Sequence, residues 1–290
     1  MLRRWTYLAL LATLAAALVG MLVLAPGAFA DAFTPESRGS QNAVDIDTLY
    51  KITLYIGIVI FVGVEGTLLY SLIKYRARRG GHEAEEIHGN TPLEIGWTIG
   101  AALILVVLTV VTFISLPDIE NPPASGPNGL RAEQASFASI DQPNPPTSGG
   151  PYLTIRVNGQ QYIWRYDYAG GDQLFSYYQM VVPTDTTIVL EVSASDVIHS
   201  WWIPDLGGKV DGVPGYVNET WFKIPAGKEG VYDGQCAELC GSGHADMRAQ
   251  VRAVTPDEFE DWARQTRRDI AEAGELLAEQ RKRGEGVEGQ

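Results

Sequence analysis

The sequence has few cysteines, few histidines and few basic residues, and these shortages exclude several classes of protein. Its two cysteines, Cys236 and Cys240, are too few for a disulfide-rich secreted scaffold, so they form a single bridge, a metal site or a redox dithiol. The 22 Lys and Arg residues face 35 Asp and Glu residues, and the resulting net charge of -13 argues against a nucleic-acid surface. A basic protein partner is favoured instead.

The chain has 290 residues, more than one typical domain, with 46% hydrophobic and only 20% charged residues. This balance predicts a membrane segment joined to a soluble core. Residues 117–151 contain Pro-Pro and Gly-Gly pairs, and such breakers predict a linker between the two parts.

Residues 1–30 have the pattern of a signal peptide. Arg3 and Arg4 provide a positively charged start, an apolar run follows, and the small-residue site at 28–30 would allow cleavage. An additional membrane helix is the alternative interpretation. Residues 31–48 are polar, and we expect them to form an external N-terminal segment.

Residues 49–116 are predicted to form a transmembrane helical hairpin. The runs at 49–73 and 93–116 are each apolar and long enough to cross a bilayer. The cations at 74–79 mark the cytoplasmic side, so both ends of the hairpin should lie outside. Glu65 lies inside the first span, either as a neutral acid packed against a partner helix or as a proton relay.

Residues 152–254 are predicted to form an all-β domain, because short β-branched and aromatic runs recur between turn signals. The fold class is therefore an α+β membrane protein, with a two-helix hairpin and a β-sandwich or small barrel. A helix-start pattern opens the tail at 255–290, which we expect to be polar and helical. The expected strands cover residues 153–157, 162–168, 177–182, 187–192, 220–224 and 249–254.

The loop at 236–247 carries the residues best suited to metal chemistry. Two thiols, an imidazole and a thioether occur within it, from Cys236, Cys240, His244 and Met247. Such soft ligands select copper over hard cations, and two cysteines three residues apart on a loop can bridge two metals. His199, at the end of an expected strand, is available as a further ligand.

Other interpretations of the two cysteines are less consistent with their neighbours. A disulfide is common in an exported protein, but it would leave the nearby His and Met residues unexplained. A zinc site would have little use for Met247. A redox dithiol usually has two residues between its cysteines in a βαβ context, whereas here there are three in an all-β context.

Four features resemble subunit II of cytochrome c oxidase over roughly residues 45–262: the hairpin, the loop CAELCGSGHADM, and the segments DVIHSWWIP and VDGVPGYVNETWF. The resemblance implies a cupredoxin-like Greek-key β-barrel that holds CuA, a centre of two copper ions. It also implies a magnesium ion bound by Glu238 and shared with subunit I. The implied copper ligands are bridging Cys236 and Cys240, terminal His199 and His244, a weak thioether from Met247 and the backbone carbonyl of Glu238.

The resemblance also implies partners. Electrons would come from cytochrome c and pass to subunit I, which reduces O2 to water with proton pumping. The chain has only four histidines, two of them in the cytoplasmic loop, so the haem and copper of the oxygen site must belong to that partner subunit. The protein would be a multi-pass protein of the bacterial cell membrane with its copper domain on the extracytoplasmic side.

Three further residues match functional positions of the family. Tyr162 stands where a tryptophan commonly receives electrons from cytochrome c, and Trp164 matches a second aromatic position that core packing would also explain. The tyrosine leaves the route of electron uptake open. Glu94 resembles an acid at the cytoplasmic mouth of a proton channel, although an acid at a helix N-terminus also interacts favourably with the helix dipole.

The main alternative is a copper-delivery membrane protein, a chaperone that uses the two cysteines and a histidine. Such a protein would be expected to have a thioredoxin-like βαβ pattern and one anchor, whereas two spans and an all-β domain are predicted here. A quinol-oxidase subunit II would lack the copper ligands. A nitrous oxide reductase would need many more histidines than four.

Overall fold

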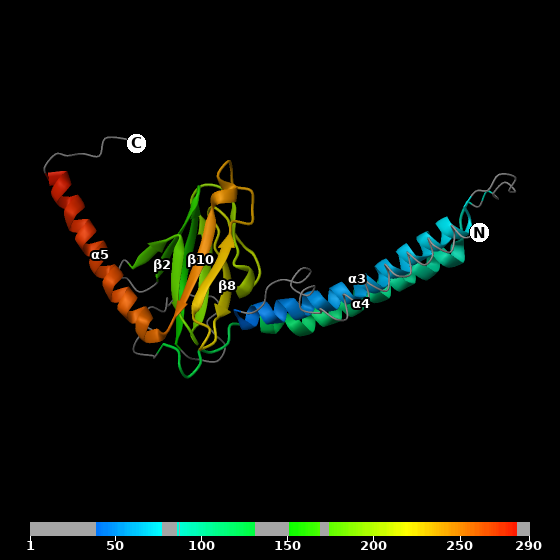
Figure 1. Cartoon of the computed structure of the whole chain (residues 1–290), viewed down its shortest axis with the longest axis horizontal. Coiled ribbons are helices and arrows are strands. Elements are labelled where there is room, and N and C mark those ends of the chain that lie inside the picture. The colour runs from blue at the N-terminus through cyan, green and yellow to red at the C-terminus, as the bar shows by residue number, and fades with distance from the viewer. Residues whose placement is uncertain (1–38, 77–85, 87, 131–150, 169–173, 283–290) are drawn as a thin grey trace, which may run out of the picture. The chain divides into compact units, whose positions relative to one another are not determined.

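The structure is a computed structural model, and it describes residues 39–76, 86, 88–130, 151–168 and 174–282 (Figure 1). The predicted signal peptide at 1–30 lies outside the described residues, as do residues 131–150 of the predicted linker.

Two long helices, α3 (Gln41–Lys74) and α4 (Thr91–Glu120), form the predicted hairpin. Their most apolar windows have mean hydropathies of 2.1 and 2.7, and none of the residues in those windows is buried within the chain. Both helices extend beyond the predicted spans, since α3 includes part of the expected external segment and α4 continues through Pro117. Hydropathy marks the limits of the membrane, but a helix can continue into water.

The start of α4 is closed by a reciprocal pair of hydrogen bonds. The side-chain oxygen of Asn90 accepts from the backbone N–H of Leu93 at 3.2 Å, and Glu94 accepts from the backbone N–H of Asn90 at 3.1 Å. These bonds satisfy donors that a helix start leaves free. Glu94 therefore has a local structural role, whether or not it also serves a proton channel.

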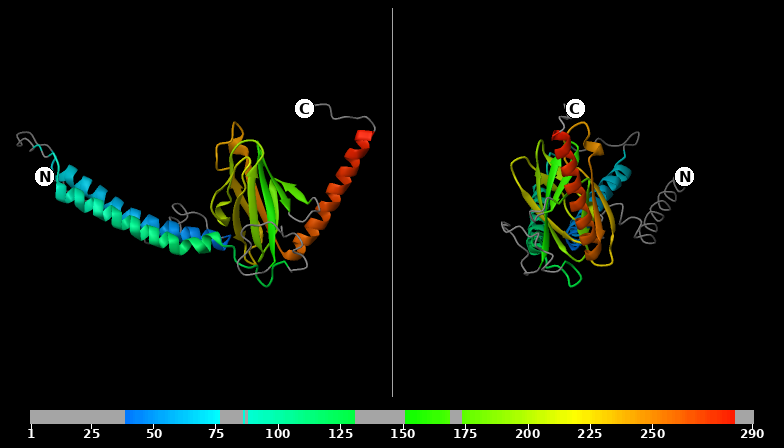
Figure 2. Two further views of the ribbon diagram at one scale, coloured as in Figure 1. Left: turned by 180° about the vertical axis from the view of Figure 1, so that it is seen from behind. Right: turned by 90° about the vertical axis from the view of Figure 1, so that its left-hand side faces the viewer.

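The β-domain contains two larger sheets and one strand pair, which confirms the predicted β-sandwich (Figure 2). The five-stranded sheet has the order β3-β2-β1-β5-β8, the second sheet has the order β4-β10-β9, and β6 pairs with β7. Pairs β1·β5 and β4·β10 are parallel and the others are antiparallel. The strands are β1 (Tyr152–Gln160), β2 (Ile163–Tyr168), β3 (Phe175–Tyr177), β4 (Gln179–Pro183), β5 (Thr187–Ala194), β6 (His199–Trp201), β7 (Val210–Gly212), β8 (Asn218–Lys223), β9 (Gly230–Gln235) and β10 (Arg248–Val254).

Each of the six predicted runs corresponds to one of these strands, whereas β6, β7 and β9 were not predicted and β3 shares only Tyr177 with a predicted run. Strands β3, β6 and β7 have only three residues each, too few to show an alternating pattern. Strand β9 contains Gly230 and Gly234, and glycine is depleted in strands. Tertiary hydrogen bonding, rather than local propensity, therefore forms these four strands.

Alternate side chains of β2 build the core between the sheets. Trp164 and Tyr166 are fully buried, and Tyr168 is nearly so. The Tyr168 hydroxyl bonds the backbone carbonyl and N–H of Val181, both at 2.8 Å, and so ties β2 to β4. Burying an aromatic side chain of this size stabilises a fold by about 1.5–3 kcal/mol.

Helix α5 (Pro256–Lys282) begins where the helix-start pattern predicted. Thr255 and Glu258 form a capping box, in which the Thr255 hydroxyl accepts from the Glu258 N–H at 3.3 Å and Glu258 accepts from the Thr255 N–H at 3.0 Å. Phe259 and Trp262 pack against Tyr168, with ring centroids 6.1 and 5.2 Å away. The first turns of the tail thus belong to the domain.

Candidate metal centre

Backbone hydrogen bonds bring two distant segments together at one end of the β-domain. The N–H of Gln235 donates to the carbonyl of Trp202 at 3.1 Å, and that of Ala237 donates to the carbonyl of Ser200 at 2.9 Å. These bonds place the loop that follows β9 beside β6. Cys236 donates its own N–H to the carbonyl of Met247 at 2.8 Å, which closes the loop on itself.

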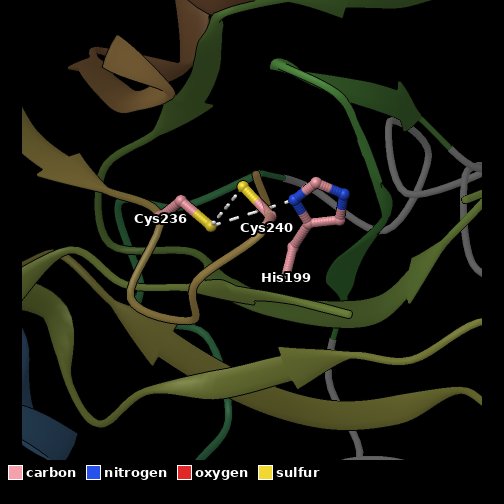
Figure 3. A group of neighbouring side chains, drawn as sticks. All are labelled: His199, Cys236 and Cys240. Atoms are coloured by element: carbon pink, nitrogen blue, oxygen red, sulfur yellow. Dashed lines mark hydrogen bonds between the residues drawn. The ribbon is translucent and has the colours of Figure 1, made fainter. Parts of the chain in front are cut away.

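The predicted ligands converge where these segments meet (Figure 3). The ligand atoms of His199, Cys236 and Cys240 all lie within 4.8 Å of one another, and all three residues are buried. His199 Nδ1 lies 3.8 Å from Cys236 Sγ. On the other side, Cys240 Sγ lies 3.6 Å from His244 Nδ1 and 3.8 Å from the Met247 sulfur. The structure therefore brings five predicted side chains together.

The two cysteines are not joined by a disulfide. Their sulfur atoms are 3.8 Å apart, whereas a disulfide bond measures about 2.05 Å. Burial and, after it, the neighbouring Cys236 thiol raise the pKa of the Cys240 thiol to about 11. Two apposed thiols in a water-poor site need a cation to balance their deprotonated forms, and a bound metal would supply it.

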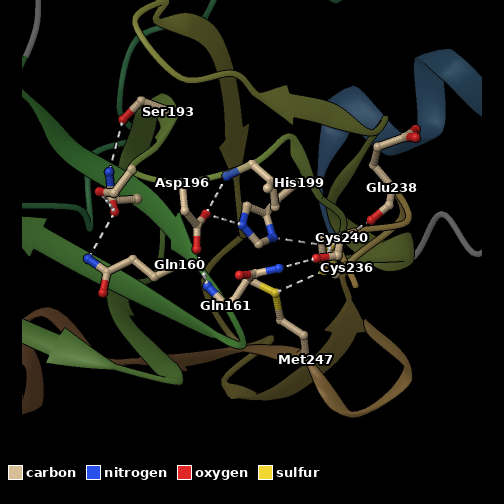
Figure 4. Close-up of polar contacts among 12 residues, drawn as sticks. Gln160, Gln161, Ser193, Asp196, His199, Cys236, Glu238, Cys240 and Met247 are labelled. Carbon is tan, nitrogen blue, oxygen red and sulfur yellow. Dashed lines mark hydrogen bonds and ion pairs between the residues drawn. The ribbon is translucent and has the colours of Figure 1, made fainter. Parts of the chain in front are cut away.

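Glu238 offers its main chain and its side chain in different directions. The backbone carbonyl oxygen lies 3.3 Å from Cys236 Sγ, facing the cluster. The side chain extends away from the sulfur atoms (Figure 4), and the residue is exposed. This arrangement directs the carboxylate toward solvent while the carbonyl faces the cysteine cluster.

The donor set fits copper by its chemistry. Thiolate and thioether donors are soft and select Cu over hard cations, and imidazole suits copper equally well. The Met247 side chain is fully buried with its sulfur toward Cys240, a position that a closed zinc site of His and Cys would not use.

Asp196 orients His199, one of the two fully buried candidate ligands, and we did not predict this role. His199 is completely buried, and its Nε2 lies 2.8 Å from the Asp196 carboxylate, so that Nδ1 faces Cys236 (Figure 4). Partial burial opposes ionisation of Asp196, but hydrogen bonds from His199 and from the backbone N–H groups of Gln161 and Val197 outweigh it and lower the pKa. A carboxylate on the second ring nitrogen fixes the tautomer and strengthens the imidazole as a ligand.

Removing this carboxylate should weaken metal binding without removing a ligand. We expect Asp196→Ala to lower copper affinity by about 10–100-fold, the usual effect of losing such a partner. Competition with a chelator would measure the change. Asp205→Ala, which alters an acid outside the ligand cluster, is the control, and equal affinities for the two variants would contradict the role of Asp196.

The two aromatic candidates differ sharply in exposure. Tyr162 is 37% exposed. Its hydroxyl lies 3.2 Å from the hydroxyl of Ser242, which belongs to the loop of residues 236–247, called the metal-binding loop below for its candidate ligands. Trp164 is fully buried and meets the His199 ring edge-on, with centroids 5.7 Å apart. Of the two side chains, only Tyr162 reaches the surface, whereas Trp164 packs against the His199 ring inside the domain. Glu94 lies on α4, outside this cluster.

Gln161 is a second residue of the site that we did not predict. Its side-chain amide donates to the carbonyl of Cys240 at 2.6 Å, and its backbone N–H donates to Asp196 at 2.7 Å. Asp196 could have been suspected, because it precedes His199 by three residues in a turn-like segment. No local signal marks Gln161, since its contacts span 35 and 79 residues of sequence.

Sequence profiles of two protein families match the chain. The profile for "Cytochrome C oxidase subunit II, periplasmic domain" matches residues 173–254. The profile for "Cytochrome C oxidase subunit II, transmembrane domain" matches residues 28–115. Together these matches include the hairpin up to residue 115 and all the candidate ligands.

Individual relatives agree with the profiles. Cytochrome c oxidase subunit 2 of Alkalihalophilus pseudofirmus is 34% identical over 72% of this chain, which spans 55% of that relative's length. The subunit 2 proteins of Thermostichus vulcanus and Cereibacter sphaeroides are 34% and 32% identical, with 77% and 82% of their lengths covered. Among solved structures, the periplasmic domain of cytochrome oxidase subunit II from Bradyrhizobium japonicum is 36% identical over 40% of this chain and 94% of that domain, with a TM-score of 0.39.

Proposed function

Because this chain belongs to the cytochrome c oxidase subunit II family, we propose that it accepts electrons from cytochrome c at a binuclear CuA centre. From there electrons pass to the haem–copper site of subunit I, which reduces O2 to water with proton pumping. The observation that carries the proposal is the pair of buried cysteine thiols, which are not joined by a disulfide and whose sulfur atoms are 3.8 Å apart. The imidazole nitrogens of His199 and His244 and the thioether of Met247 lie beside them. Two copper ions held there would exchange single electrons with little change in geometry.

The protein residues have distinct parts in this proposal. Cys236 and Cys240 would hold the copper ions through their thiolates, His199 and His244 through imidazole nitrogens, and Met247 through a weak thioether contact from the buried side. Asp196 holds the His199 ring in the orientation that the site requires. The buried Trp164 helps to exclude water behind that ring, which limits solvent reorganisation around the metals.

Two further assignments concern the boundary with subunit I. The outward carboxylate of Glu238 would bind a magnesium ion shared with that subunit, and Glu94 would lie at the mouth of its proton channel. The apolar faces of α3 and α4 would contact lipid and the other oxidase subunits. The hairpin would cross the cell membrane twice and hold the β-domain on the extracytoplasmic side, where the donor is found.

The charge of the β-domain supports a basic donor. Residues 151–255 contain 12 acidic and 7 basic residues, a net charge of -5. A complementary field speeds the encounter with a basic protein and makes the rate sensitive to salt. Cytochrome c, rather than an anionic partner, fits this field.

The proposal is tested by purifying the chain with its partner subunits and measuring copper and donor oxidation. We expect two coppers in this chain, a delocalised mixed-valence spectrum, and oxidation of reduced cytochrome c. A single copper with a blue-copper spectrum would overturn the binuclear centre. Oxidation of quinol but not of cytochrome c would overturn the proposed donor.

Tyr162 is the residue through which we expect electrons to enter, because its exposed ring lies against the metal-binding loop. Tyr162→Ala should slow reduction by cytochrome c by about thirtyfold or more, since removing a hot-spot aromatic contact typically costs at least about 2 kcal/mol and every 1.4 kcal/mol is about tenfold. The copper spectrum should be unchanged. Rapid-mixing kinetics at low salt would measure the rate.

Tyr177→Ala is the matched control for this variant, because Tyr177 is also exposed, at 45%, but belongs to the edge strand β3. Its rate should equal that of the unmodified protein. Equal rates for both variants would exclude Tyr162 as the contact.

A further inference from the structure

The end of β1 and the turn that joins it to β2 contact the candidate metal site at three points, although they contribute no ligand. Gly159 lies so close to His199 that an added Cβ would be 2.8 Å from the ring. Gln161 bonds the main chain of Cys240 and the side chain of Asp196. Tyr162 lies over the glycines of the metal-binding loop, where a Cβ on Gly243 would be 2.5 Å from its ring.

Gln161 connects the two ligand-bearing segments to each other. Its side-chain amide holds the loop through Cys240, and its backbone N–H holds Asp196, which in turn bonds His199 at 2.8 Å (Figure 4). A continuous series of hydrogen bonds therefore runs from the carbonyl of one ligand to the ring of another. Every bond in this series is made by protein atoms alone.

The metal-binding loop has a shape that admits these side chains. Gly241 has φ +131°, a backbone conformation that favours glycine. A Cβ at this position would lie 2.9 Å from the Gln161 amide nitrogen and 2.6 Å from the Tyr162 hydroxyl. A glycine at position 241 therefore leaves the space that the Gln161 and Tyr162 side chains occupy against the loop.

We propose that Gln161 is a positioning residue that clamps the Cys240 and His199 segments in their ligand geometry before copper binds. The contacts need no metal, so the clamp itself is independent of the proposed function. Its consequence for electron transfer does rest on that function. Because Tyr162 follows Gln161 directly, the same turn would hold the electron-accepting aromatic side chain in a fixed position relative to the copper ligands.

The test uses the reactivity of the two thiols in the full-length chain without copper. Cys236 and Cys240 are the only cysteines, so any reaction with a thiol reagent reports on this site. Gln161→Met keeps the length of the side chain and its neutrality but cannot donate a hydrogen bond. We expect about fivefold faster modification, which is the change in loop opening that the loss of one net hydrogen bond produces.

Gln160→Met is the matched control, because the neighbouring amide bonds Asn158 at 3.1 Å rather than the metal-binding loop. It should react at the rate of the unmodified chain. In urea unfolding, followed by circular dichroism, the midpoints of both variants should fall by a similar small amount, since each variant loses one side-chain hydrogen bond. Equal thiol reactivity in the two variants, or an acceleration accompanied by a urea midpoint clearly lower in Gln161→Met than in Gln160→Met, would overturn the proposal.

Copper loading separates this proposal from the proposed function. We expect Gln161→Met to bind copper with the same stoichiometry as the unmodified chain but to lose it to a chelator about fivefold faster, again by loss of one hydrogen bond. If the unmodified chain bound no mixed-valence pair of copper ions, the proposed function would be wrong. The thiol measurement without copper would still show whether Gln161 positions the Cys240 and His199 segments. If Gln161→Met did not accumulate, Gln161→Leu would replace it with the same expected increase in thiol reactivity, since leucine is also neutral and cannot donate a hydrogen bond.

Discussion

Cys240→Ser should abolish the binuclear copper centre and stop the oxidation of cytochrome c by the complex. Cys240 contacts the other thiol and two further candidate ligands, since its sulfur lies 3.8 Å from Cys236 Sγ, 3.6 Å from His244 Nδ1 and 3.8 Å from the Met247 sulfur. A serine hydroxyl is a hard donor that stays protonated at neutral pH and cannot replace a bridging thiolate. Copper content should fall to roughly one ion per chain or less, with loss of the mixed-valence spectrum.

The expected loss of activity is more than about a hundredfold, because even outer partners of metal ligands contribute about 10–100-fold. Leu239→Ser is the matched control, since it places the same residue one position earlier in the loop at a side chain that is 77% exposed. This control should keep both copper ions. Two coppers and a mixed-valence spectrum in Cys240→Ser would refute the proposed ligand set.

Gly234→Ala should destabilise the β-domain and separate the two ligand segments. A Cβ at Gly234 would lie 2.0 Å from the carbonyl oxygen of Trp202, so β9 would have to move away from that backbone. The same carbonyl accepts the Gln235 N–H that aligns the metal-binding loop with β6. We expect a loss of about 3 kcal/mol in the free energy of unfolding, as for overpacking against a rigid neighbour.

Gly230→Ala is the matched control in the same strand, because no atom lies within 4 Å of a Cβ built there. Its free energy of unfolding should stay within about 0.5 kcal/mol of the unmodified protein. Urea unfolding and copper affinity would be measured for both variants, and only Gly234→Ala should lower copper affinity. Similar stability of the two variants would show that the strand tolerates the added methyl group.

The membrane hairpin and the soft ligand set could be predicted because each depends on local sequence. A span is recognised by continuous hydropathy, and four of the ligand side chains occur within residues 236–247. The positions of the helix ends were predicted less accurately, since α4 continues through Pro117, where we expected a linker. In that region the helix continues beyond the apolar residues that revealed it.

The strands were predictable where alternation was long enough to detect. Strands β1 and β5 have nine and eight residues and matched predicted runs. Strand β6 has three residues, yet it carries His199 and aligns the site. Its pairing with β7 depends on the register of the domain, which no window of local sequence reveals.

The sequence by itself determined the hairpin, the β-rich domain and the set of candidate donor atoms, because hydropathy and ligand chemistry belong to individual residues. Only the tertiary structure decided how those atoms are arranged. It placed Asp196 on His199, Gln161 on Cys240, and Tyr162 at the surface while burying Trp164. These contacts join residues up to 79 positions apart, so they follow from sheet register and backbone packing rather than from local pattern.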